Sequence, residues 1–93
     1  MIRKLKIEKL ISDDINPYFF SVKDVSEAHR GHQSFKEDVE SHFEIIIVTD
    51  KFHNKNKIER HRIVNKILKE EFLSDLHSVT LKAYSIQEYD KFQ

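Results

Sequence analysis

The first part of the chain changes from a helical to a strand-like pattern of apolar residues. Ile7, Leu10 and Ile11 lie three and four positions apart, which predicts a helix over residues 2 to about 14. Basic residues begin this helix and acidic residues end it, against the helix dipole, so burial of the apolar stripe must stabilise it. Pro17 ends the helix, and the aromatic and β-branched run after it predicts a strand over residues 18–25.

Two later segments also have strand-like patterns. The solid β-branched run within residues 42–49 predicts a central strand that is covered on both faces. Residues 77–84 alternate instead, so that Val79, Leu81 and Ala83 share one face of a third strand.

The best-defined helix of the chain lies between these two strands. Asn56 and Glu59 have the spacing of a capping box, which predicts that the helix begins here. Its apolar stripe consists of Ile63, Val64, Ile67, Leu68 and Phe72.

A second capping box, Ser85 with Glu88, predicts a short last helix, and Tyr84 and Tyr89 are placed as its hydrophobic staple. The predicted order is therefore α-β-β-α-β-α. Long connections around the main helix favour a mixed three-stranded sheet in which a crossover joins the second and third strands. We predict an α+β fold.

Residues 26–40 are polar, lack a period and contain the only glycine, Gly31, which predicts a long loop. Loops of this length within a small domain tend to carry function.

Length and composition exclude several classes of protein. The 93 residues amount to a single domain, residues 1–93. The absence of Cys excludes a disulfide framework, a cysteine zinc finger and a cysteine nucleophile. One glycine is too few for a glycine-rich phosphate loop. No apolar run approaches a membrane span or a signal peptide, so we expect a soluble, cytoplasmic protein with no membrane partner.

The balanced charge, 16 basic against 16 acidic residues, conceals a basic segment. Residues 51–69 hold seven Lys or Arg and one acid, a net charge of +6, so the remainder carries −6. This segment indicates a surface for an acidic partner or for phosphates, and charge alone does not choose between them.

Three histidines have positions that suit chemistry, and each also has a plainer interpretation. His29 and His32 lie three residues apart in the long loop, where two imidazoles can face one metal or can simply be solvated. His77 begins the third strand, where it is either a rigidly held, partly exposed ligand or a histidine packed at a strand end and bonded to backbone. On the main helix, His61 lies on the apolar stripe, which favours a core-facing role.

The start of the main helix concentrates the basic residues. A helix N-terminus beside guanidinium groups suits phosphate contact, although a run of charges is more often a solvated face. The residues concerned are Lys55, Lys57, Arg60, His61, Arg62 and Lys66. No strained nucleophile turn is present, so we do not expect an enzyme.

These motifs, taken in order, resemble the BolA family over residues 4 to about 90. Phe52, followed eight residues later by Arg60-His61-Arg62, is the most specific part of the match. The other matching segments are residues 24–26 (DVS), 29–32 (HRGH), 40–43 (ESHF) and 76–79 (LHSV). In one departure, Asn54 stands where relatives usually carry glycine; asparagine tolerates a positive φ, so the turn can survive.

The resemblance implies a fold like the second class of KH domains, with helices packed on one face of a mixed three-stranded sheet. It also implies a non-enzymatic partner of a monothiol glutaredoxin, with a shared 2Fe-2S cluster for iron–sulfur assembly, trafficking or iron sensing. By position, His77 corresponds to the family's ligand on the last strand and His29 to the loop ligand, with His32 as its substitute. The glutaredoxin and glutathione would supply the sulfur ligands.

The alternative implied by the resemblance is a DNA-binding transcriptional regulator that uses the basic helix around Arg60 and Arg62. Both activities could use overlapping surfaces, in which case a bound glutaredoxin would block DNA. We expect the apo protein to be a monomer.

Overall fold

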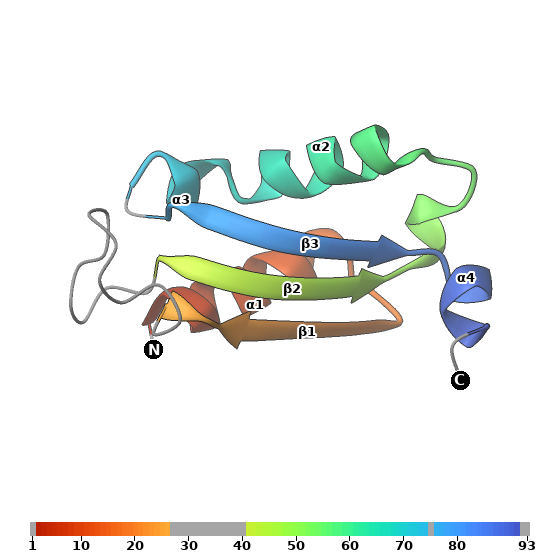
Figure 1. Cartoon of the computed structure of the whole chain (residues 1–93), viewed down its shortest axis with the longest axis horizontal. Helices are drawn as coiled ribbons and strands as arrows, with labels where there is room; N and C mark the ends of the chain where they lie inside the picture. Colours follow the sequence, from red (N-terminus) through yellow and green to blue (C-terminus); the bar gives the residue numbers. More distant parts are fainter. Residues whose placement is uncertain (1, 27–40, 75, 92–93) are drawn as a thin grey trace.

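The computed structural model describes residues 2–26, 41–74 and 76–91 of the chain (Figure 1). The elements follow the predicted α-β-β-α-β-α order, with a one-turn 3₁₀ helix and a short helical continuation added. They are α1 (Ile2–Asp14), β1 (Phe19–Asp24), β2 (His42–Val48), η2 (Asp50–Phe52), α2 (Lys57–Ile67), α3 (Lys69–Phe72), β3 (Ser78–Tyr84) and α4 (Ile86–Asp90). Within the described ranges, no helix is long and apolar enough to cross a membrane.

The sheet is mixed, as predicted, with the strand order β1-β2-β3. β1 pairs antiparallel with β2, and β2 pairs parallel with β3, so β2 is the central strand. Val22, Ile45 and Leu81 are register partners across the three strands and therefore share a face. β2 ends one residue before the predicted boundary because Thr49 instead caps η2, its side chain accepting a hydrogen bond from the N–H of Lys51.

One face of the sheet forms the core together with α1 and α2. The apolar stripe of α1 is buried at Ile7 and Ile11, and that of α2 at Val64 and Leu68. They pack with the inward residues of the strands, and Figure 1 shows α1 behind the sheet and α2 alongside β3. The predicted α+β fold class is confirmed. α1 has no acid in its first turn and no base in its last, so packing stabilises it, as expected.

The expectation that β2 is covered on both faces is wrong. Phe43, Ile45 and Ile47 are buried against the helices, but Glu44 is exposed and Ile46 only half-buried on the opposite face. A β-branched run does not by itself distinguish these cases, because strand propensity also favours β-branched residues on an open face.

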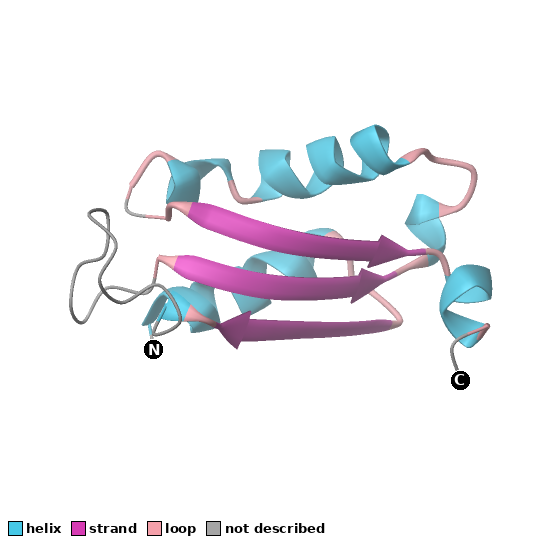
Figure 2. Ribbon diagram, in the orientation of Figure 1, coloured by secondary structure: helices cyan, strands magenta, loops and turns pink. Residues whose placement is uncertain are grey.

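The short helix α4 covers one end of the open face. Val48 lies on this face and is fully buried. Its register partners are Phe19 and Tyr84, and Tyr89 of α4 stacks on Phe19 with ring centroids 5.6 Å apart. The Tyr84 and Tyr89 rings lie 6.1 Å apart, which confirms the predicted staple. Figure 2 shows α4 at the end of the sheet where β2 and β3 finish.

Asn54 has a φ of 64°, so it occupies the left-handed region that glycine usually fills. The turn between η2 and α2 therefore forms without glycine. Before it, Phe52 is fully buried and fixes the turn to the core.

Candidate functional site

His77 lies immediately before β3, with its backbone held and its side chain exposed. Its N–H donates a hydrogen bond of 2.8 Å to the carbonyl of Ser41, which also accepts one of 3.2 Å from the N–H of Ser78. The preceding Leu76 is buried and anchors the chain in the core. A backbone-bonded start of the strand thus presents an accessible imidazole.

His42, which did not stand out in the sequence, lies against His77. The residue is 8% exposed, and its Nδ1 lies 2.8 Å from the hydroxyl oxygen of Ser41. The two imidazole rings stack with centroids 5.7 Å apart and an angle of 29° between their planes. Because His42 pairs with Ser78 in the parallel register, a correct alignment of the two strands would have placed it beside His77.

The two ends of the segment that links β1 to β2 meet beside this histidine pair. The Ser26 hydroxyl oxygen accepts hydrogen bonds from the N–H groups of Ser41, at 3.0 Å, and of His42, at 3.2 Å. Asp24 in turn accepts a bond from the N–H of Ser26 at 2.9 Å. We call this arrangement of Asp24, Ser26 and Ser41 the stem.

His29 and His32 lie outside the described residues, and so does most of the predicted loop. Their positions in the sequence fall between the two sides of the stem. Among the residues that are described, no group of three or more His, Cys, Asp or Glu side chains has the arrangement of a metal site. His77 lies exposed at this end of the sheet.

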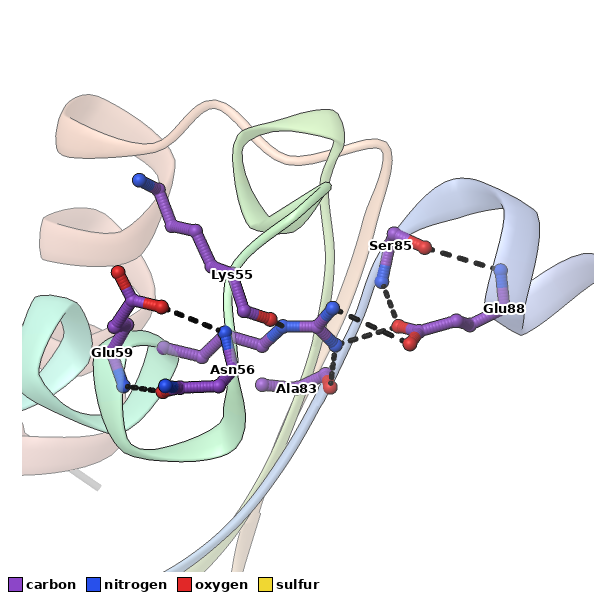
Figure 3. A network of polar contacts seen from close by, with 7 residues as sticks. Lys55, Asn56, Glu59, Ala83, Ser85 and Glu88 are labelled. Atoms are coloured by element: carbon purple, nitrogen blue, oxygen red, sulfur yellow. Dashed lines mark hydrogen bonds and ion pairs between the residues drawn. The ribbon is translucent and has the colours of Figure 1, made fainter.

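At the other end of β3, Arg60 is tied into the protein. Its Nη1 and Nη2 lie 2.6 Å and 3.3 Å from the two carboxylate oxygens of Glu88, which joins α2 to α4 (Figure 3). Arg60 also donates to the carbonyls of Lys55, at 2.8 Å, and Ala83, at 3.0 Å, and only 11% of its side chain is exposed. The guanidinium lies 5.8 Å from the centre of the Phe52 ring.

The contact with Arg60 also changes the acidity of Glu88. The hydrogen bond from Arg60, followed by that from the N–H of Ser85, lowers the pKa of Glu88 from 4.5 to about 2. Glu88 is thus a carboxylate at neutral pH and offsets the Arg60 charge. The positive electrostatic potential of the basic segment therefore comes from its other Lys and Arg side chains.

A cleft of about 450 Å³ opens beside this ion pair, between the start of α2 and the end of β3. Of the predicted basic residues, Lys55, Lys57, Arg60 and His61 line it, and His61 is half-buried on its wall. Arg62 and Lys66 are exposed on α2 and are not part of its lining.

The cleft includes a residue that the sequence analysis missed. Lys82 of β3 lines the cleft. The sequence could have indicated it, because the alternation of the third strand places this lysine on the face opposite the core. The N-terminus of α2 is partly satisfied by its own capping box, in which Asn56 and Glu59 exchange hydrogen bonds as predicted. Phosphate contact at this end would depend on the lysines more than on the helix N–H groups.

His77 does not line the cleft. His77 stands at the start of β3 and Ala83 near its end, about 20 Å apart at about 3.3 Å per strand residue. The two candidate sites therefore lie at opposite ends of the same strand.

The fold defines a small α+β domain with a mixed three-stranded sheet. The family model for the BolA-like proteins matches residues 11–88. DNA-binding transcriptional regulator BolA of Escherichia coli strain K12 is 32% identical over 93 residues, which cover all of this chain and 84% of the relative. The chain belongs to the BolA family.

Two comparisons concern a plant protein in which this domain is one part. SufE-like protein 1 of Arabidopsis thaliana, a chloroplastic/mitochondrial protein, is 33% identical over 85 residues, which cover 87% of this chain and 23% of the relative. The chain therefore spans about a quarter of that protein. The structure of its BolA domain superposes with a TM-score of 0.85 at 34% identity and covers 92% of this chain and 94% of that one.

Proposed function

We propose that the protein is a non-enzymatic partner of a monothiol glutaredoxin and shares a 2Fe-2S cluster with it through histidine ligands. The observation that carries the proposal is the position of His77. An exposed imidazole follows a buried residue, and its backbone is bonded to Ser41 of the stem, the residue that follows residues 27–40 in the sequence. A ligand held in this way loses little backbone freedom when it binds.

The donor set of the chain fits half of such a cluster. Neutral imidazoles replace two cysteines on one iron in known two-iron clusters, and the chain has histidines but no Cys. His77 would be one ligand, and His29, or His32 in its place, would be the second. Thiolates for the other iron would come from the glutaredoxin and from glutathione, so this chain cannot hold the cluster alone.

The bound cluster would supply an iron–sulfur centre to be passed on or sensed. The role of this chain is to present imidazole in place of thiolate, which raises the reduction potential of such a centre. The stem and the β2–β3 pairing would keep His77 at the end of the sheet while the cluster is bound or passed on.

The reconstitution of a complex tests the proposal. The purified protein is mixed with a monothiol glutaredoxin, glutathione, ferric iron and sulfide under anaerobic conditions. We expect a coloured heterodimer that stays intact in size-exclusion chromatography. Formation of a glutaredoxin homodimer only, with this chain eluting colourless as a separate species, would contradict the proposal.

A second candidate function is DNA binding, and the cleft at the end of β3 favours it. Lys55 in the turn before α2, Lys57 of α2 and Lys82 of β3 line this cleft, and lysine side chains contact phosphates through charge. The bacterial relative above is named a DNA-binding regulator. A gel-shift titration at about 150 mM salt tests this candidate, and no complex at micromolar protein would remove its support.

A further inference from the structure

We propose that His42 is a positioning residue that fixes the orientation of the His77 imidazole. The inference rests on the proposed function, since it concerns the same ligand. Neither the resemblance nor the comparisons assign a role to His42, and its place in the structure suggests one.

The first step is that His42 itself is held. The residue is more than nine-tenths buried, and its Nδ1 is within hydrogen-bond distance of the Ser41 hydroxyl. Its N–H donates to the Ser26 hydroxyl, and its carbonyl accepts from the N–H of Val25. Both the backbone and the ring of His42 are therefore held by the stem.

The second step is that His42 transmits this order to His77. An exposed histidine at a strand end has several χ1 rotamers and a broad χ2 distribution. Here one face of the His77 ring packs on the His42 ring at 5.7 Å between centroids. The backbone of His77 is fixed by Ser41, the same residue that holds His42. One serine thus anchors both the ligand's backbone and the ring on which the ligand rests.

The third step is a separation of the two possible roles of His42. If the ring face positions His77, a phenylalanine in place of His42 keeps the contact, although it cannot ligate a metal. If a ring nitrogen of His42 is itself a ligand, phenylalanine cannot replace it. The variants His42→Phe and His42→Ala therefore distinguish packing from ligation.

The experiment measures His77 in the apo protein and in the complex. Three-bond couplings from the backbone to Cγ, measured by NMR on the full chain, report the χ1 populations of His77. We expect one dominant rotamer in the wild type and in His42→Phe, and averaging over rotamers in His42→Ala. In the glutaredoxin complex, His42→Ala should lose the cluster about 10-fold faster than the wild type, at the low end of what outer partners of metal ligands contribute. His42→Phe should stay close to the wild-type rate.

Unchanged χ1 couplings in His42→Ala would overturn the inference, as would a His42→Phe variant that keeps the His77 rotamer but loses the cluster as fast as His42→Ala. If His42→Ala does not fold, Ser41→Ala removes the hydroxyl that contacts Nδ1 of His42 and should loosen His77 partly; no loosening would also overturn the inference. The χ1 couplings of the apo protein test the positioning role of His42 and do not depend on the cluster. A cluster that stays intact in His77→Ala would contradict only the proposed function. His53→Ala, in an exposed turn, is the matched control.

Discussion

Arg60 and Glu88 form a two-pronged ion pair, 2.6 Å and 3.3 Å in its two contacts, that ties α2 to α4 at the end of the sheet. The same carboxylate closes the capping box of α4 by accepting a 2.8 Å bond from the N–H of Ser85. The Glu88 side chain therefore caps the N-terminus of α4 and also binds this helix to α2.

Replacing Glu88 by glutamine should destabilise the protein by about 1–2 kcal/mol. The cost stays below that of breaking a fully buried pair because 46% of the Glu88 side chain is exposed. Urea unfolding followed by far-ultraviolet circular dichroism measures the change. Asp90→Asn, which removes an exposed charge from the same helix, should change the stability by less than about 0.5 kcal/mol. Equal effects of the two variants would refute the role of the pair.

The contribution of Glu88 should depend on pH. Its pKa is lowered in the folded protein from 4.5 to about 2, so its stabilising effect is fully present above about pH 4.5 and is lost as the pH falls through about 2. The difference in unfolding free energy between the wild type and Glu88→Gln should therefore shrink as the pH is lowered over this range. A constant difference from pH 6 to pH 2 would show that the carboxylate charge is not responsible.

The DNA-binding candidate makes distinct predictions for lysine and arginine. Lys57→Gln should weaken DNA binding and reduce the slope of log affinity against log salt by about 1, without a change in unfolding, because Lys57 is exposed on the cleft. Arg60→Gln should lower stability, since Arg60 is tied to Glu88 and to two carbonyls. Lys9→Gln on α1 controls for net charge. If Arg60→Gln lowers the salt slope while leaving stability unchanged, Arg60 contacts phosphate instead.

The stem should also contribute to stability. Ser26→Ala removes the acceptor for the N–H groups of Ser41 and His42, both of them in buried residues. We expect a loss of about 1–3 kcal/mol in the free energy of unfolding, because the two donors are left without this partner. Ser12→Ala, at an exposed position of α1, should be nearly neutral. A neutral Ser26→Ala would mean that water replaces the hydroxyl at no cost.

Local patterns in the sequence predicted the helices and strands well, but they did not predict contacts between residues that are distant in the sequence. The capping boxes at Asn56 and Ser85 involve residues three apart, so the spacing alone identified both helix starts. The ion pair of Glu88 with Arg60 could not be predicted from the sequence, because the two residues are 28 positions apart.

In the candidate site, too, residues with a local sequence pattern were predicted, and residues placed by strand pairing were not. His77 was found because it begins an alternating strand and matches a family motif. His42 was passed over because its importance comes from the strand register, which places it beside His77. Lys82 was missed for the same reason, since it joins the basic cleft from β3.

The visible circular dichroism spectrum of the glutaredoxin complex tests the central claim most directly. The wild type and His53→Ala should show the same cluster bands, because His53 is exposed in the turn between η2 and α2, well away from β3's start. His77→Ala should lose the bands that distinguish the heterodimer, while its far-ultraviolet spectrum shows a folded protein. Unchanged cluster bands in His77→Ala would contradict the account.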